Sequence, residues 1–131
     1  MAKVTKSDAE WKEQLDPLAY KVTRKAATER AFSHEEFPDG PGTFNCLCCG
    51  AVLFDKAHKF DSGSGWPSFY QPKEGAPVGE RDDRSWFMRR TEVHCTDCAA
   101  HLGHVFNDGP HPTGLRYCIN GVALTFEPDE N

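Results

Sequence analysis

Two C-x-x-C pairs constrain the fold of this chain more than any other feature of its sequence. Cys46 and Cys49 form the first pair, Cys95 and Cys98 form the second, and 45 residues lie between them. A single pair would leave a redox couple or disulfides open, but four thiolates in two such pairs suit tetrahedral zinc in a closed structural site. We therefore expect these four cysteines to bind one structural Zn²⁺ and to tie together two distant hairpins of a small core.

Two cysteines remain outside that set. Cys48 lies inside the first pair, where it is either a small structural residue or a second redox thiol. Cys118 lies in Arg116-Tyr-Cys-Ile-Asn120, which is typical of a β-strand, so Arg116, Cys118 and Asn120 are predicted to share one face. A guanidinium and an amide beside a thiol favour the thiolate. Cys118 is therefore the candidate nucleophile, and a buried structural cysteine is the ordinary alternative.

Length and charge bound the other possibilities. The 131 residues fit one domain, and a formal net charge of -5 argues against general affinity for nucleic-acid phosphates. No apolar run is long enough to cross a membrane, and no hydrophobic signal-peptide core follows Met1. We expect a cytoplasmic protein, in which cysteines bind metals or react rather than form disulfides.

Local patterns predict a helical arm over residues 1–31 and a β-rich body over residues 32–131. Ser7-Asp-Ala-Glu10 has the form of a capping box and predicts a short helix with Trp11 and Leu15 on one side. Asp16-Pro17 predicts a second helix, over 17–24, with Leu18 and Val22 as its buried stripe. Short apolar runs between turn residues predict strands, and one charged stretch predicts a turn. The predicted strands are 42–46, 51–54, 86–93 and 116–126, and the predicted turn is 81–84.

Two further stretches carry residues suited to a chemical site. His101, His104 and Asp108 concentrate proton donors near neutral pH. A bare H-x-x-H is more often a metal-binding pair or a pair of satisfied polar residues, but four cysteines already account for a metal. Upstream, glycines on both sides of Ser64 indicate an irregular backbone that presents the Trp66 indole as the wall of an apolar pocket.

Taken together, these motifs closely resemble those of the B-type peptide methionine-(R)-S-oxide reductases. The resemblance rests on the two C-x-x-C pairs, Gly65-Trp-Pro-Ser-Phe69, His101-Leu-Gly-His-Val-Phe106 and Arg116-Tyr-Cys-Ile-Asn120, with further likeness at 20–24 and 28–33. It implies one domain over residues 1–131. The implied fold is mainly β, with two antiparallel β-sheets, short N-terminal helices and a structural zinc site.

The resemblance also implies roles for individual residues. Cys118 would attack the sulfoxide sulfur, release methionine and become a sulfenic acid. His101 and His104 would organise the acid that the oxygen needs, with Asp108 assisting. Arg116 and Asn120 would hold the thiolate and position the substrate. The implied substrate-binding residues are Trp66, which would receive the S-methyl group and set the R configuration, Phe69 and Phe106.

One position departs from the family pattern. Many members carry a resolving cysteine where this chain has Ser64, which cannot form a disulfide with Cys118. We expect thioredoxin or a small thiol to reduce the sulfenic acid directly, with a Cys48–Cys118 disulfide as the alternative.

The expected partners are oxidised methionine in proteins and that thiol reductant, with no nucleic acid or membrane, and the chain is expected to be a monomer. Two other classes stay open. One is a zinc-knuckle binding module in which Cys118 is inert, and the other is a peroxidase or redox sensor that uses Cys118.

Overall fold

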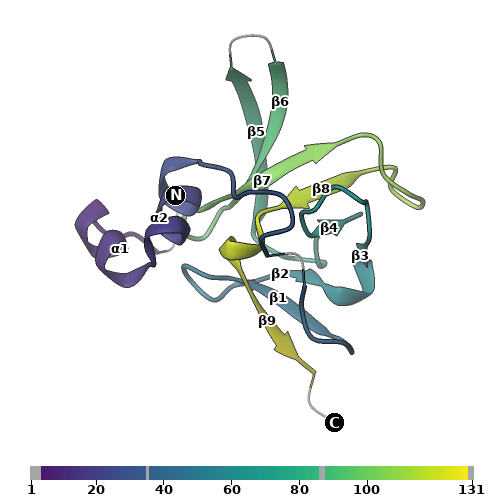
Figure 1. Ribbon diagram of the computed structural model, residues 1–131, viewed down its shortest axis with the longest axis horizontal. Helices are drawn as coiled ribbons and strands as arrows, with labels where there is room; N and C mark the ends of the chain where they lie inside the picture. The colour runs from purple at the N-terminus through teal and green to yellow at the C-terminus, as the bar shows by residue number, and fades with distance from the viewer. Residues whose placement is uncertain (1–3, 35, 86–87, 130–131) are drawn as a thin grey trace.

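Two antiparallel β-sheets dominate the computed structural model, which describes residues 4–34, 36–85 and 88–129 (Figure 1). Within those residues, one sheet has three strands in the order β2-β1-β9, and the other has six in the order β3-β4-β8-β7-β6-β5. The strands of the smaller sheet are β1 (Gly42–Cys46), β2 (Val52–Asp55) and β9 (Leu124–Pro128). Those of the larger sheet are β3 (Lys59–Phe60), β4 (Ser68–Phe69), β5 (Val78–Ser85), β6 (Met88–Cys95), β7 (His101–Phe106) and β8 (Arg116–Ile119). The prediction of a mainly β fold with two antiparallel sheets is confirmed.

Two short helices precede the sheets, as predicted. The helix α1 (Asp8–Gln14) begins with a complete capping box, in which the Ser7 hydroxyl accepts from the Glu10 amide and the Glu10 carboxylate accepts from the Ser7 amide. The helix α2 (Pro17–Lys25) follows directly, with Pro17 in its first turn. Its buried residues are Ala19, Val22 and Thr23. Leu18 is 41% exposed, so its predicted place in the buried stripe is wrong.

The predicted strand over 116–126 is in fact two strands that belong to different sheets. β8 ends at Ile119, the 3₁₀ turn η2 (Gly121–Ala123) follows, and β9 begins at Leu124. The break lies at Asn120, because its backbone amide and its side-chain amide both donate to the Leu102 carbonyl. These bonds hold residue 120 against the larger sheet, and the turn then directs the chain to the smaller sheet.

The predicted charged turn at 81–84 is also wrong. These residues lie inside β5, where Asp82 pairs with Thr91 and Asp83 pairs with Arg90 of β6. The strand accommodates its charges because β5 is an edge strand of the larger sheet and Arg90 donates to Asp83 at 3.2 Å. The predicted strand over 86–93 corresponds to β6, and its first two positions lie outside the described residues.

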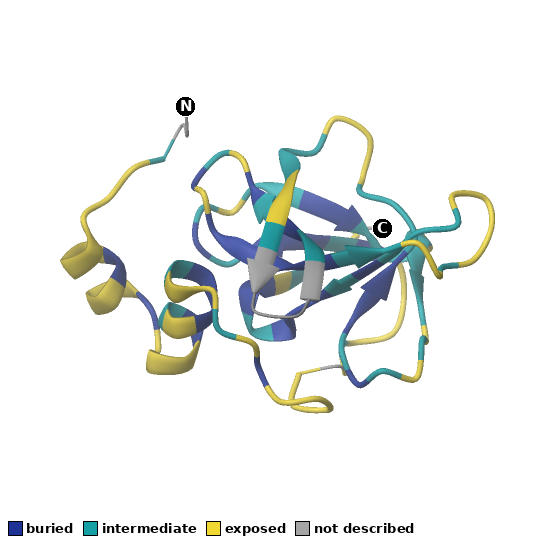
Figure 2. Ribbon diagram, turned by 90° about the horizontal axis from the view of Figure 1, so that it is seen from above, coloured by how far each residue is buried: buried dark blue, intermediate teal, exposed yellow. Residues whose placement is uncertain are grey.

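Aromatic side chains join the two sheets. Phe44 from β1, Phe54 from β2 and Phe69 from β4 are fully buried. The Phe69 ring stacks on Phe54 at 4.3 Å between centroids and meets Phe44 edge-on at 5.1 Å. Each fully buried phenylalanine contributes roughly 1.5–3 kcal/mol. Figure 2 shows that buried residues gather in the strands, whereas much of the helical arm is exposed. In the described part of the chain, no helix has the length and apolar character needed to span a membrane.

Candidate active site and metal centre

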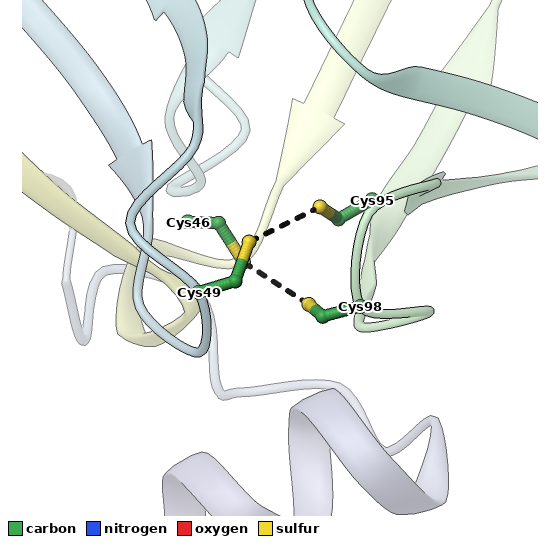
Figure 3. Close-up of side chains that lie close together, drawn as sticks. All are labelled: Cys46, Cys49, Cys95 and Cys98. Atoms are coloured by element: carbon green, nitrogen blue, oxygen red, sulfur yellow. Dashed lines mark hydrogen bonds between the residues drawn. The ribbon is translucent and has the colours of Figure 1, made fainter. Parts of the chain in front are cut away.

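Four sulfurs come together between the hairpins of the two sheets (Figure 3). Cys46 and Cys49 lie at the end of β1, and Cys95 and Cys98 lie at the end of β6. All four Sγ atoms are within 4.8 Å of one another, with 3.6 Å between Cys46 and Cys98 and 3.7 Å between Cys49 and Cys95. Zn–S bonds of about 2.3 Å in a tetrahedron require sulfurs about 3.8 Å apart. The cluster is therefore able to hold a tetrahedral metal ion, and none of these cysteines is in a disulfide.

The two cysteine pairs share one backbone design. In the first, the Cys46 carbonyl accepts from the Gly50 amide at 2.8 Å; in the second, the Cys95 carbonyl accepts from the Ala99 amide at 2.7 Å. Gly50 and Ala99 both have positive φ, at 79° and 65°. The small residues after each pair thus allow a tight turn around the cluster.

A fifth sulfur lies beside this cluster. Cys48 is only 6% exposed, and hydrogen bonding links its thiol with Cys46 and Cys98. Its backbone carbonyl accepts from Gln14, which joins the helical arm to the first cysteine pair. Cys48 is therefore held beside the four-cysteine cluster by its surroundings.

The sixth cysteine, Cys118, lies in a different place, on β8 of the larger sheet. It is partly exposed, whereas its neighbours Tyr117 and Ile119 point into the core, so the predicted alternation of faces is confirmed. It borders a hollow of about 110 Å³. The hollow is lined by Thr28, Trp66, Arg90, Gly103, His104, Phe106, Cys118 and Asn120. Trp66, His104, Phe106, Cys118 and Asn120 are thus brought together from three separate stretches of the sequence.

Burial, rather than positive charge, dominates the electrostatics of the Cys118 thiol. Desolvation raises its pKa above the ordinary thiol value, and this effect outweighs the lowering by the Ser64 hydroxyl, 4.0 Å from Sγ, and by Arg116. The prediction that its surroundings favour the thiolate is therefore wrong in its net direction. In the free protein, the Cys118 sulfur carries its proton at neutral pH.

This shift predicts the pH dependence of Cys118 reactivity. Only the thiolate is alkylated, so the rate with iodoacetamide should still rise about tenfold per pH unit near pH 8 and level off above the ordinary thiol pKa of about 8.5. Ser64→Ala should move the midpoint further upward, because it removes a group that lowers the pKa. Mass spectrometry of the Cys118 peptide reports the rate. A plateau below pH 7 would contradict this account.

The two histidines lie next to each other on β7, and each pairs with a carboxylate: His101 with one on the adjacent strand β6, and His104 with one on β5, the strand beyond it. His101 Nδ1 lies 2.9 Å from Glu92, and His104 Nε2 lies 2.9 Å from Asp83. Burial lowers the pKa of His101 and its pairing with Glu92 only partly offsets this, so His101 is neutral at pH 7. Asp83 stays ionised, since the His104 hydrogen bond holds its pKa below the usual range. Of the two histidines, only His104 lines the hollow, and its contact with Asp83 holds the ring in place there.

Arg116 and Asp108 form a pair of their own at the exposed rim. The guanidinium donates to both carboxylate oxygens, at 2.9 and 3.2 Å, and stacks over the Phe106 ring at 4.4 Å. The Arg116 hydrogen bond lowers the pKa of Asp108, which contacts neither histidine in the interactions described. Asp108 therefore holds Arg116 in place, and its expected assistance to the histidines stays a prediction.

Phe69 does not join the site. Its ring is fully buried between Phe44 and Phe54, away from the residues that line the hollow. The expected substrate contact is corrected to a core contact. The physical reason is the pairing of β4 with β8, which sets Ser68 opposite Cys118 and Phe69 opposite the core residue Tyr117.

Several residues at the site were not predicted from the sequence. Thr28 and Arg90 line the hollow, and Asp83 and Glu92 hold the histidines. Glu29 is 2% exposed and forms hydrogen bonds with both Trp66 and Asn120. The one available signal for Glu29 was its place in the stretch 28–33, which carries part of the family resemblance. Its burial, which only the structure shows, is unusual for an acidic residue.

The sequence of this chain is similar to one protein family along nearly its whole length. The chain matches the SelR domain over residues 15–128. It is 55% identical over 128 residues to a peptide methionine sulfoxide reductase MsrB of Methylibium petroleiphilum, covering 96% of this chain and 92% of the relative. Proteins of the same name from Acinetobacter baumannii and Leptospira interrogans are 50% and 51% identical over 131 and 127 residues. These alignments cover 99% and 96% of this chain and 94% and 97% of the relatives.

Proposed function

Because the chain belongs to the SelR domain family, we propose that it is an oxidoreductase that reduces methionine-(R)-sulfoxide in proteins to methionine, with Cys118 as the nucleophile. The observation that carries this proposal is the hollow in which Cys118 meets His104 and the Trp66 indole. Its volume, about 110 Å³, is well below the roughly 300–1,000 Å³ of drug-sized ligand sites. It suits the end of one side chain, such as an oxidised methionine presented by another protein.

The groups around the hollow supply what sulfoxide reduction needs. The Cys118 sulfur attacks the sulfoxide sulfur, and the S–O bond breaks as the oxygen passes to Cys118. The products are methionine and Cys118 sulfenic acid, so methionine sulfoxide is reduced and the thiol is oxidised by two electrons. The net step conserves protons, since the proton of the thiol ends on the sulfenic acid. His104, whose Nε2 is paired with Asp83, accepts the thiol proton on its other ring nitrogen and donates it to the oxygen as negative charge develops there.

Selectivity comes from the apolar walls. We assign the S-methyl group to Trp66 and Phe106, which line the hollow together with Cys118. The indole N–H donates to the Glu29 carbonyl at 3.1 Å, which fixes the plane of the ring. With the methyl group on the indole and the oxygen on His104, one configuration at sulfur presents its electrophilic side to Cys118.

An epimer comparison tests this function. The purified protein with dithiothreitol should reduce the R epimer of a methionine sulfoxide peptide at least about 100-fold faster than the S epimer, a preference of about 2.7 kcal/mol. Chromatography of the reduced, methionine-containing peptide gives both rates. Equal rates would indicate a generally reactive thiol, and no reduction of either epimer would reject the proposal.

The four-cysteine cluster supports a structural role for zinc. We assign Zn²⁺ to Cys46, Cys49, Cys95 and Cys98, because an all-sulfur tetrahedral site is typical of zinc that stabilises a fold. Such a site leaves no ligand position open for substrate. The chain is proposed to act as one domain, in which this cluster joins the two sheets.

Recycling of the sulfenic acid requires an external thiol. Ser64 is the side chain beside Cys118 Sγ, whereas Cys48 is buried beside the four-cysteine cluster. We propose that thioredoxin or a small thiol attacks Cys118 directly and forms a mixed disulfide, which a second thiol opens. Two external thiols are thereby oxidised, and one water leaves with the sulfenic oxygen.

Ser64→Cys tests this interpretation of recycling. The Ser64 hydroxyl oxygen lies 4.0 Å from the Cys118 sulfur. A thiol at position 64 therefore needs only a small rotamer change to form a disulfide with Cys118. We expect oxidation by one equivalent of sulfoxide to give an intramolecular disulfide in this variant and a free sulfenic acid in the unchanged protein. Thiol titration and peptide mapping distinguish the two. A Cys48–Cys118 disulfide in the unchanged protein would overturn direct reduction.

A further inference from the structure

One fully buried glutamate ties together two walls of the hollow. The backbone amide of Glu29 donates to the Asn120 side chain at 3.0 Å, and its carbonyl accepts from the Trp66 indole at 3.1 Å. Both partners line the hollow, but they come from segments more than fifty positions apart in the chain. The backbone of one residue therefore links Trp66 to Asn120.

The side chain of the same residue holds its backbone in place. Its Oε1 accepts from the Val122 amide at 2.8 Å and lies 3.3 Å from His34 Nδ1. Val122 follows Asn120 by two positions, in the turn η2. Removing the carboxylate would leave a partly buried backbone amide without its acceptor.

Two glycines allow residues 28–34, here called the strap, to lie this close. A Cβ on Gly65, the residue before Trp66, would come within 2.8 Å of the Phe32 backbone nitrogen. A Cβ on Gly121, the residue after Asn120, would come within 2.0 Å of the His34 carbonyl oxygen. The Phe32 amide also donates to the Gly65 carbonyl. The strap thus packs directly against the backbone beside Trp66 and beside Asn120.

A contribution to stability alone does not explain why the Glu29 carboxylate is buried at this position. The second oxygen, Oε2, is buried and has no hydrogen-bond partner among the described residues. Burying a poorly satisfied carboxylate is unfavourable, and apolar replacements of buried charges are often neutral or stabilising. Its place at the junction of Trp66 and Asn120 indicates a role in the geometry of the hollow.

We propose that Glu29 is a positioning residue that sets the spacing and orientation of Trp66 and Asn120 through the strap. This inference rests on the proposed reduction at Cys118 and adds the element that shapes the methyl-binding wall. It makes Glu29 a determinant of substrate affinity and epimer preference, although it lies outside the lining of the hollow.

The test compares Glu29→Ala with Glu29→Gln. Alanine removes the Val122 acceptor, so KM for the R epimer should rise about tenfold and the R-to-S preference should fall by a similar factor. Glutamine keeps an oxygen at that point, so it should restore both values to within about twofold. Glu36→Ala, an exposed glutamate close to the strap, is the matched control and should behave like the unchanged protein.

Two readouts separate positioning from mere folding. Gly121→Ala pushes on the His34 carbonyl while leaving Glu29 intact, and it should reproduce the rise in KM. The fluorescence of Trp66, obtained by subtracting spectra of Trp66→Phe variants, should shift to longer wavelength in Glu29→Ala, because the backbone carbonyl of residue 29 is no longer held against the indole. If Glu29→Ala does not fold, Gly121→Ala decides the question.

Unchanged KM and epimer preference in a folded Glu29→Ala protein would overturn the proposal, as would a loss confined to kcat. Failure of the underlying function gives a different result. In that case, the unchanged protein itself would not reduce the R epimer.

Discussion

Replacing Cys118 with serine should lower the rate of R-sulfoxide reduction by at least about 10³-fold, because a hydroxyl is far less ionised and less nucleophilic than a thiol. The fold should survive, since the two side chains are similar in size and Cys118 is partly exposed. Rates with dithiothreitol, the melting temperature and the metal content are measured together. Substantial activity in a folded, metal-replete Cys118→Ser protein would reject Cys118 as the nucleophile.

Cys48→Ser is the matched control for that experiment. Cys48 is the other cysteine outside the four-sulfur cluster, but it lies beside Cys46 and Cys98 instead of the hollow. Its replacement should leave the rate of reduction within about twofold. A large loss in this variant with unchanged metal content would assign chemistry to Cys48.

Removal of the metal should be the most destabilising change. The cluster joins the β1–β2 hairpin of one sheet to the β6–β7 hairpin of the other, and without a cation four crowded sulfurs must share protons. We expect a strong chelator, or Cys49→Ser, to cost roughly 5 kcal/mol or more, which is about 15 °C or more in melting temperature for a chain of this size.

Calorimetry with and without chelator measures that loss, and elemental analysis should give one zinc per chain. Addition of Zn²⁺ should restore the melting temperature in the chelated protein but not fully in Cys49→Ser. A protein that contains no metal and melts at the same temperature with chelator would contradict the assigned role of the cluster.

The sequence predicted best those features that depend on local chemistry. The capping box at Ser7, the proline that opens α2 and the β1 strand all follow from short-range preferences, and all are confirmed. The duplicated cysteine pairs predicted a cluster because their spacing is itself the geometry of a metal-binding turn. Alternation around Cys118 likewise placed Tyr117 and Ile119 in the core.

Long-range pairing explains the errors. The stretch 81–84 has the composition of a turn, but β6 supplies partners for its charges and makes it a strand. Residues 116–126 have a continuous strand-like pattern, and only the bonds from Asn120 to Leu102 show where the chain leaves the sheet. Phe69 follows a motif that carries site residues, yet its register opposite Tyr117 directs the ring inward.

Most of the residues that line the hollow were predicted from the sequence, but the residues that hold them in place were not. Cys118, His104, Trp66, Phe106 and Asn120 line one hollow, as the motifs suggested. The carboxylates that hold the histidines come from β5 and β6, and Glu29 comes from the helical arm. No spacing rule links these segments to the motifs, because their proximity is a property of the folded sheets.

A single-turnover experiment tests the central claim, that the oxygen of the sulfoxide passes to the Cys118 sulfur. The protein is mixed with excess R-sulfoxide peptide without reductant, quenched with a reagent that captures sulfenic acids, and mapped by mass spectrometry. We predict one methionine formed per chain and a matching adduct on Cys118, with Cys48 and the four cluster cysteines unmodified. An adduct on another cysteine, or methionine formed without oxidation of Cys118, would contradict the account.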